Sequence, residues 1–206
     1  MTALSRLRKN AIFETVFLVA VALGLALSVQ AYAVKPYRIP SPSMEPTLHI
    51  GQRVLVNRLT HRLGSKPSVG DIIVFHPPAA ADDEGCGAAG QGGGTQFPCS
   101  RPVPKHSGET FIKRVVAVGG DTIAIRGGHA VRNGVREKDP YVAPCGDSPE
   151  QCTFSHAITV PKGYVFVMGD NRGQSDDSRF WGPVPLKWVI GDAIATYWPP
   201  DRIGGV

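Results

Sequence analysis

A run of twenty uncharged residues near the N-terminus restricts the fold of this chain more than any other feature. Residues 15–34, TVFLVAVALGLALSVQAYAV, contain no Asp, Glu, Lys or Arg. About 20 apolar residues in a helix cover roughly 30 Å, which is the thickness of the hydrocarbon core of a bilayer. We therefore expect a transmembrane anchor over residues 12–34, preceded by a short tail over residues 1–11.

The charges before this run predict its orientation. Arg6, Arg8 and Lys9 precede it, and the basic flank of a membrane segment stays in the cytoplasm. A cleavable secretory signal that ends at residues 31–33, Ala-Tyr-Ala, is the alternative. The apolar stretch of such a signal is only about 7–15 residues long, so the length of the run favours a retained anchor. Both interpretations export residues 35–206.

The net charge of +5 does not indicate a protein that binds nucleic acid. Residues 1–40 hold five basic residues and one acid, whereas residues 41–206 hold seventeen basic and sixteen acidic residues. The basic character therefore belongs to the N-terminal region. The remainder of the chain lacks the excess of positive charge that nucleic-acid binding requires.

The four cysteines agree with export. An even number of cysteines in an exported chain predicts disulfides, here two. Among the three possible pairings, sequence proximity favours Cys86–Cys99 and Cys145–Cys152. No Cys-x-x-Cys pair is present, and the spacings do not suit a zinc site, so we expect no metal.

The composition after the apolar run favours β structure. The chain holds 24 Gly and 18 Pro, which suit short strands joined by turns better than long helices. Apolar segments bounded by turn residues predict strands, and they lie at 51–59, 72–75, 111–118, 122–125, 164–168 and 189–197. The Asn133-Gly134 pair predicts a hairpin turn.

Residues 79–108 differ from the segments on either side. Hydrophobic periodicity is absent there, and six of the ten residues 85–94 are glycine. We expect a mobile Gly-rich loop inserted into one domain, because strands of the same character resume after it. The predicted fold class is mainly β: an N-terminal transmembrane helix followed by an all-β domain of antiparallel sheets over residues 35–206.

A proline-rich segment holds the first candidate site residues. In residues 39–48, IPSPSMEPTL, the prolines restrict the backbone and place Ser41 and Ser43 on a stiff loop. A nucleophilic serine needs such rigidity, because its oxygen must meet a carbonyl within a narrow geometry. A proline-rich linker between a membrane and a domain is the structural alternative.

A lysine in a predicted strand is the second candidate. Phe111, Lys113 and Val115 share one face of that strand, and Arg114 lies on the other. Burial penalises an ammonium group and lowers its pKa, which makes a neutral lysine a usable general base. The alternative is a lysine that keeps its ammonium group in water.

A polar loop is the third candidate. Residues 168–182 follow a predicted buried strand and hold nine polar residues in the ten positions that end at Arg179. Apolar residues at both ends fix this loop to the core, although a solvated loop is the simpler alternative. Asp177 and Arg179 can form an ion pair that gives a rigid turn and presents Ser175.

These segments together resemble the bacterial type I signal peptidases, the leader peptidases of the inner membrane. The matching motifs are 40–48 (PSPSMEPTL), 70–75 (GDIIVF), 112–116 (IKRVV), and 169–172 (GDNR) with Ser175, Asp177, Ser178 and Arg179. The motifs follow an apolar N-terminal run in the family's order. The resemblance covers essentially the whole chain.

The resemblance implies a role for each matching residue. Ser43 matches the family's nucleophile, and Lys113 matches its general base. Ser41 matches the serine whose hydroxyl forms an oxyanion hole together with the backbone N–H of Ser43. Ser175 matches the serine that orients the lysine. A supporting pair is matched by Asp177 and Arg179.

The resemblance also implies a substrate and a location. The family removes signal peptides from exported preproteins, binding them as an added strand and cutting after small-x-small sites through an acyl-enzyme. It works in the bacterial inner membrane, with its all-β catalytic domain on the periplasmic side and with the secretion machinery nearby. We expect a single-pass protein with a cytoplasmic N-terminus that contacts the lipid bilayer and needs no cofactor, metal or nucleic acid.

Two alternatives remain open at this point. A related Ser/Lys processing peptidase with a narrow substrate, such as a pilin or a conjugation factor, would have the same dyad. A membrane-anchored β-domain that binds peptides without cutting them would not need Ser43 or Lys113. A Ser-x-x-Lys acyltransferase is disfavoured, because no lysine follows Ser41 or Ser43 at that spacing.

Overall fold

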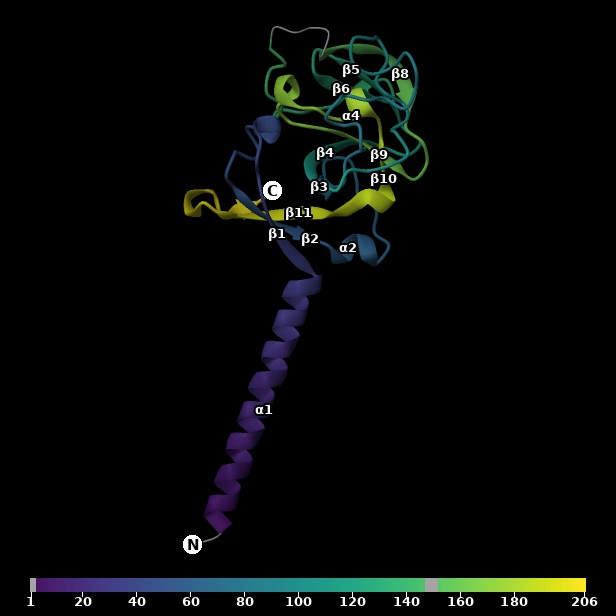
Figure 1. The fold of residues 1–206 in the computed structure, drawn as a ribbon. Coiled ribbons are helices and arrows are strands. Elements are labelled where there is room, and N and C mark those ends of the chain that lie inside the picture. Colours follow the sequence, from purple (N-terminus) through teal and green to yellow (C-terminus); the bar gives the residue numbers. More distant parts are fainter. Residues whose placement is uncertain (1–2, 147–151) are drawn as a thin grey trace.

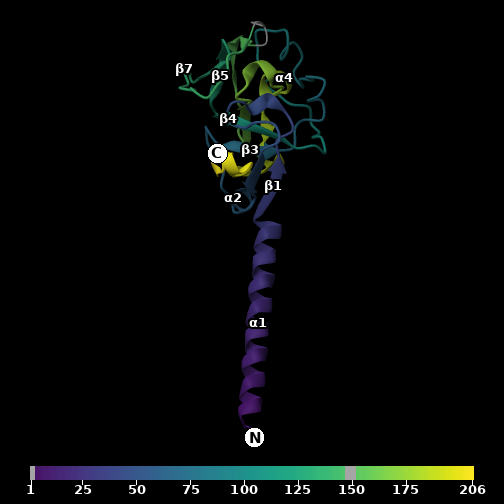
Figure 2. The ribbon, with the colours of Figure 1, turned by 90° about the vertical axis from the view of Figure 1, so that its left-hand side faces the viewer.

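The computed structural model describes residues 3–146 and 152–206 as one long N-terminal helix followed by a β-rich domain (Figure 1). The helix α1 (Ala3–Tyr32) extends away from the domain in both side views (Figures 1 and 2). The first strand, β1 (Val34–Arg38), begins two residues after the helix ends. The helix therefore leads directly into the larger sheet.

The predicted transmembrane anchor is not confirmed. Among the residues that the structure describes, no helix has both the length and the apolar character needed to cross a bilayer. The helix contains most of the predicted segment 12–34, but it begins nine residues earlier, and Val34 belongs to β1. The side chains of residues 1–11 and 29–32, and with them the predicted tail and cleavage motif, lie outside the described set.

The larger of the two sheets is antiparallel and carries the strands that position the site. Its strand order is β1-β2-β11-β3-β4-β9-β10, with β12 paired to β11. The remaining strands of this sheet are β2 (Arg53–Asn57), β3 (Ile72–Phe75), β4 (Phe111–Val118), β9 (Tyr164–Met168), β10 (Val184–Pro185), β11 (Val189–Trp198) and β12 (Gly204–Gly205). The C-terminal strand β11 thus separates β2 from β3, so the sheet is completed only by the end of the chain.

A second antiparallel sheet lies above the first in Figure 1. Its order is β7-β6-β5-β8, and its strands are β5 (Thr122–Arg126), β6 (His129–Arg132), β7 (Val135–Arg136) and β8 (Phe154–Thr159). Asn133 and Gly134 connect β6 to β7 with positive φ angles of 53° and 79°. This confirms the predicted hairpin, whose tight turn requires positive φ at both central residues.

The remaining elements of the described residues are single helical turns. They are α2 (Leu59–Arg62), α4 (Ser178–Trp181), η1 (Pro42–Met44), η2 (Arg172–Gln174), η3 (Leu186–Trp188) and η4 (Pro200–Arg202). The mainly β fold class, with antiparallel sheets, is therefore confirmed. All six predicted strands are present, whereas β1, β8, β10 and β12 were missed. Polar and proline residues interrupt the apolar pattern of β1 and β8, and β10 and β12 are only two residues long.

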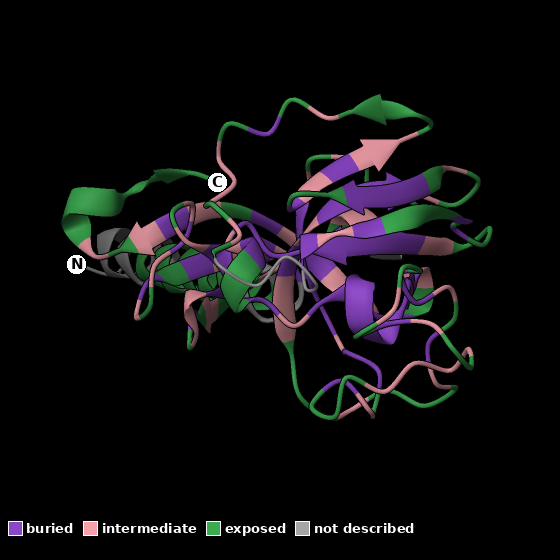
Figure 3. Cartoon of the chain, turned by 90° about the horizontal axis from the view of Figure 1, so that it is seen from above, coloured by how far each residue is buried: buried purple, intermediate pink, exposed green. Residues whose placement is uncertain are grey.

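The two faces of the larger sheet pack against separate groups of apolar side chains. Ile73 and Phe75 of β3 belong to the core cluster that also contains Phe166 and Trp181. Ile72 and Val74 point to the opposite face and pack in a smaller cluster, which also holds Ile39, Met44 and Leu48. Figure 3 shows the buried residues concentrated in the strands. The smaller cluster fixes the proline-rich segment to the sheet.

The Gly-rich loop of residues 79–108 has no helix or strand of its own, as the sequence predicts, but it is tied to the domain. Both predicted disulfides are confirmed, Cys86–Cys99 within this loop and Cys145–Cys152 near the smaller sheet. The N–H of Cys99 donates to the carbonyl of Arg179 at 2.9 Å. The loop therefore packs directly beside the polar loop that the sequence identified as a candidate site.

Gly191 of β11 provides a test of how closely β11 packs against β2 in the larger sheet. A Cβ at this position would overlap the carbonyl group of Asn57 on the neighbouring β2. We expect Gly191→Ala to lower the free energy of unfolding by about 1–3 kcal/mol, because the strands must separate to admit the methyl group. Gly204→Ala, where an added Cβ meets open space, is the control. Equal stability of both variants in urea unfolding would contradict this packing.

Candidate active site

Ser43 lies in a stiff turn beside the larger sheet. Pro42 occupies the first position of η1 and fixes its φ angle, while Ser41 precedes the turn in an extended conformation. The Ser41 hydroxyl donates to Ser43 Oγ at 3.2 Å. The first backbone hydrogen bond of the turn is from Glu45 N–H to Pro42 O. The N–H of Ser43 therefore precedes the bonded donors of the turn, and a ligand could accept from it.

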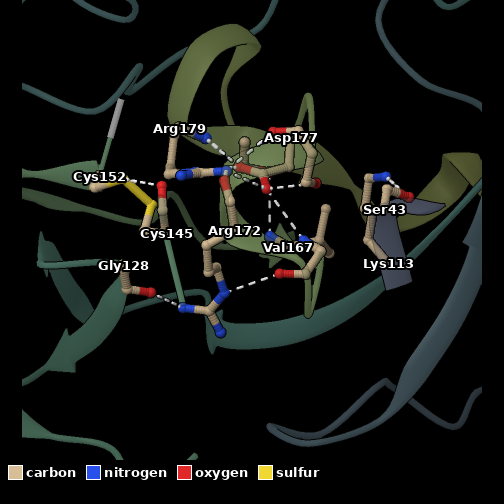
Figure 4. Close-up of polar contacts among 12 residues, drawn as sticks. Ser43, Lys113, Gly128, Cys145, Cys152, Val167, Arg172, Asp177 and Arg179 are labelled. Carbon is tan, nitrogen blue, oxygen red and sulfur yellow. Dashed lines mark hydrogen bonds and ion pairs between the residues drawn. A yellow bond between two sulfur atoms is a disulfide. The ribbon is translucent and has the colours of Figure 1, made fainter. Parts of the chain in front are cut away.

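The amine of Lys113 meets the hydroxyl of Ser43. Lys113 Nζ donates to Ser43 Oγ at 2.6 Å, and Figure 4 shows the two side chains converging. Lys113 lies in β4, and only 4% of the residue is exposed. Its amine lies 5.6 Å from the centroid of the Phe111 ring, which is on the same strand face. The structure thus buries this lysine, as the strand pattern predicts.

Burial lowers the pKa of Lys113 from 10.5 to about 8. The carboxylates of Asp177 and Asp176 oppose the shift, because their negative charge favours the ammonium form. A lysine with a pKa of about 8 is partly neutral near neutral pH. A neutral amine at this distance from Ser43 can take the hydroxyl proton, so the pair can act as a nucleophile and a general base.

One buried carboxylate holds the polar loop together. Asp177 accepts hydrogen bonds from the Gly169 N–H at 3.0 Å, the Ser175 hydroxyl at 2.8 Å and Arg179 Nε at 2.8 Å (Figure 4). Burial alone would raise the pKa of Asp177, but the guanidinium of Arg179 and these hydrogen bonds lower it below its usual value. Arg179 also donates to the carbonyls of Arg172 and Ser175. The ion pair that the sequence predicts between Asp177 and Arg179 is present.

Ser175 lies close to the dyad, but none of the described hydrogen bonds joins its hydroxyl to Ser43 or Lys113. It donates to Asp177, and in the described structure Lys113 makes its side-chain hydrogen bond to Ser43 instead. That Ser175 orients the lysine therefore stays a prediction. A Cβ at Gly169 would overlap Ser175 Oγ and the carbonyl of Ser43. Glycine at this position lets the polar loop approach the serine turn.

A buried group that the sequence did not identify joins these parts. Asp170 is fully buried and forms a bidentate ion pair with Arg114. Both carboxylate oxygens accept hydrogen bonds from the guanidinium, with N–O distances of 2.9 and 2.7 Å. The Thr47 hydroxyl donates to the same carboxylate at 2.5 Å. The neighbouring Asn171 N–H donates to the carbonyl of Ser43 at 3.1 Å. Asp170 stands in the matched GDNR motif, which was the one available sign of its importance.

Ser43 and Lys113 open into a cleft of about 380 Å³. Residues of four separate segments line it, and they are Tyr37, Arg38, Ile39, Pro40, Ser41, Ser43, Val74, Glu109, Thr110, Phe111, Ile112, Lys113, Gln174 and Asp176. The sequence did not predict Gln174 or Asp176 as site residues, because its motifs do not distinguish them from the other polar residues of the loop. Among the described residues, no group of three or more His, Cys, Asp or Glu side chains could hold a metal ion.

Comparison with known proteins identifies the family. A family model described as signal peptidase, peptidase S26, matches residues 12–198. The chain belongs to this family. The resemblance to type I signal peptidases is thereby confirmed, and the protein is an enzyme of a serine endopeptidase family.

Two relatives agree with this assignment. A probable signal peptidase I-1 from Synechocystis is 37% identical over 93% of this chain and 85% of its own length. A probable signal peptidase I from Mycobacterium leprae is 33% identical over 97% of this chain and 80% of its own length. The crystal structure of a signal peptidase I from Enterococcus faecalis V583 is 27% identical, with a TM-score of 0.41, and the match covers 62% of this chain and 97% of that one.

The pair formed by Arg114 and Asp170 should stabilise the site. Arg114→Met would leave the fully buried Asp170 carboxylate without a cation, so we expect a loss of about 3 kcal/mol in the free energy of unfolding. The double variant Arg114→Met/Asp170→Asn also removes the unpaired carboxylate charge and should recover part of this loss. Urea unfolding measures both changes. A double variant as unstable as the sum of the two single variants would contradict the pairing.

Proposed function

We propose that this protein is a membrane-bound serine endopeptidase that removes signal peptides from exported preproteins, cutting after small-x-small sites with Ser43 as the nucleophile and Lys113 as the general base. The observation that carries the proposal is the distance of 2.6 Å between Lys113 Nζ and Ser43 Oγ inside a cleft. The burial that brings the pKa of Lys113 to about 8 supports it further. The names of its relatives supply the substrate class.

Acylation would use three atoms of the serine turn. Ser43 Oγ attacks the carbonyl carbon of the scissile bond while Lys113 Nζ takes the hydroxyl proton. The oxyanion that forms accepts hydrogen bonds from the Ser43 N–H and the Ser41 hydroxyl, which lies 3.2 Å from Ser43 Oγ. The C–N bond then breaks, and the ammonium of Lys113 gives its proton to the leaving amine. The product is an ester between Ser43 and the signal peptide.

Deacylation would use the same base. Lys113, again neutral, takes a proton from water as the water oxygen attacks the ester carbonyl. The proton returns to Ser43 Oγ when the ester bond breaks, which restores the resting enzyme. Asp177 and Arg179 support these steps by fixing the polar loop against the serine turn. Ser175 can keep its hydrogen bond to Asp177 while its hydroxyl oxygen accepts one from the lysine, because a hydroxyl both donates and accepts.

We further propose that residues 12–34, some of whose side chains lie outside the described set, form a single-pass anchor in the bacterial inner membrane, with the N-terminus cytoplasmic and the catalytic domain on the periplasmic side. The uncharged run of residues 15–34 and the basic residues before it support this topology. The exposed apolar side chains of α1 support it as well. The two disulfides suit an oxidising compartment. A nearby secretion machinery would deliver the substrates.

Variants of the dyad test the proposal. Ser43→Ala and Lys113→Met should each abolish cleavage of a purified preprotein, and the double variant should be no worse than either, because the two residues act as a unit. Ser41→Ala should keep some activity and lose about 10²–10³ in rate, because one oxyanion donor disappears. Mass spectrometry of the products locates the cut.

The controls for these variants are exposed residues of the same types, Ser65→Ala and Lys162→Met. Lys113→Met should also unfold at the same or a higher denaturant concentration at pH 7, because the methionine removes a desolvation penalty of about 3 kcal/mol. A Lys113→Met enzyme that still cuts preprotein would overturn the mechanism. A wild-type enzyme that binds preproteins without cutting them would indicate the peptide-binding alternative, and one that cuts a single substrate would indicate a narrow processing peptidase.

The pH dependence follows from the lysine. Its pKa of about 8 lies below the ordinary value, so the base form is lost as the pH falls through 8. We expect kcat/KM to fall about tenfold per unit below pH 7 and to reach a plateau above about pH 9. The measurement is a pH profile with a peptide substrate that has no titrating group. A profile in which kcat/KM falls to half of its plateau near pH 6 would indicate a different base.

A further inference from the structure

Asp176 lies in the cleft beside the dyad, and the proposed reaction does not use it. It lines the same cleft as Ser43 and Lys113. Its Oδ1 atom is shielded from water and receives no hydrogen bond from the part of the chain that the structure describes. A shielded carboxylate oxygen without a donor is unfavourable, because no hydrogen bond compensates for its loss of water. Such a group in a substrate cleft points to a donor supplied by the substrate.

The surroundings of Asp176 are negative. Burial, the carboxylate of Asp177 and the carboxylate of Glu84 in the Gly-rich loop all raise its pKa, to about 7, with a smaller contribution from Asp82. The ammonium of Lys113 opposes them. Lys113 must be neutral to act as a base, so the other charged residues of the catalytically competent cleft are the cation Arg38 and the acids Glu109 and Asp176, which leave an excess of negative charge.

We propose that Asp176 is a specificity-determining residue, whose carboxylate binds the cationic side chain of a lysine or arginine in the peptide near the scissile bond. This inference rests on the proposed function and adds a preference that small-x-small recognition does not contain. A backbone N–H of the peptide is a weaker alternative, because it is neutral and would not balance the negative surroundings. The Gly-rich loop contributes indirectly, because the carboxylate of its Glu84 adds negative charge near Asp176.

A lysine scan locates the preferred position. Peptides that share one small-x-small site carry a lysine, or in its place a norleucine, at each position within five residues of the cut. At pH 8.5 we expect wild-type kcat/KM to favour lysine about tenfold at one of these positions. Asp176→Asn should reduce this ratio to near one, because an amide keeps the shape and an acceptor oxygen but loses the charge.

The pH dependence of the ratio is a second test. Protonation of Asp176 removes its charge, so the preference should be present above about pH 7 and lost by pH 5.5. Protonation of Lys113 slows both peptides alike and cancels in the ratio. Asp83→Asn, which removes an exposed charge from the Gly-rich loop, is the matched control and should keep the preference.

Binding separates this inference from the proposed function. The Ser43→Ala variant cannot cut by the proposed mechanism, so its affinity for the lysine and norleucine peptides reports recognition alone. We expect the same tenfold preference in fluorescence anisotropy, and its loss in Ser43→Ala/Asp176→Asn. Equal affinities for the two peptides, or an Asp176→Asn substitution that weakens both equally, would overturn the inference. A wild-type enzyme that cuts no peptide while the binding preference persists would overturn the proposed function instead.

Discussion

The buried carboxylate of Asp177 is the interaction on which the rest of the site depends. It accepts hydrogen bonds from a backbone N–H and a hydroxyl of the loop between β9 and α4, and from the guanidinium of Arg179 in α4. A charge in this position is stable only because Arg179 balances it and hydrogen bonds surround it. Arg179 then reaches two further carbonyls of the same loop. The loop is therefore a rigid body that can hold its neighbours in place.

The charge of Asp177 also affects the pKa values of two groups in the cleft. Burial lowers the pKa of Lys113, while Asp177 raises it, and the balance lies at about 8. Burial, together with the charge of Asp177, raises the pKa of Asp176 to about 7. Two groups that titrate near neutral pH thus lie in one cleft and have opposite charges in their ionised forms. A single structural carboxylate affects both the base and the residue that we infer to select the substrate.

The serine turn depends on contacts from distant parts of the chain. Met44 packs into the smaller apolar cluster, Asn171 binds the carbonyl of Ser43, and Lys113 binds its hydroxyl. The Gly-rich loop, closed by Cys86–Cys99, supports the other side through the backbone of Arg179. The prolines stiffen the turn, but these contacts determine where its hydroxyl points.

The sequence by itself determined the local features of this protein. Apolar periodicity gave the strands, the Asn133-Gly134 pair gave a hairpin, and cysteine proximity gave both disulfides. These signals depend on neighbouring residues, and so did the motifs that revealed the family. Tertiary structure decided the rest. The pairing of Arg114 with Asp170 and the position of Asp176 in the cleft depend on strands and loops that meet only in the folded chain. Where such segments pack together, the burial and the charge around each side chain depend on residues far apart in sequence. A local sequence pattern therefore cannot predict them.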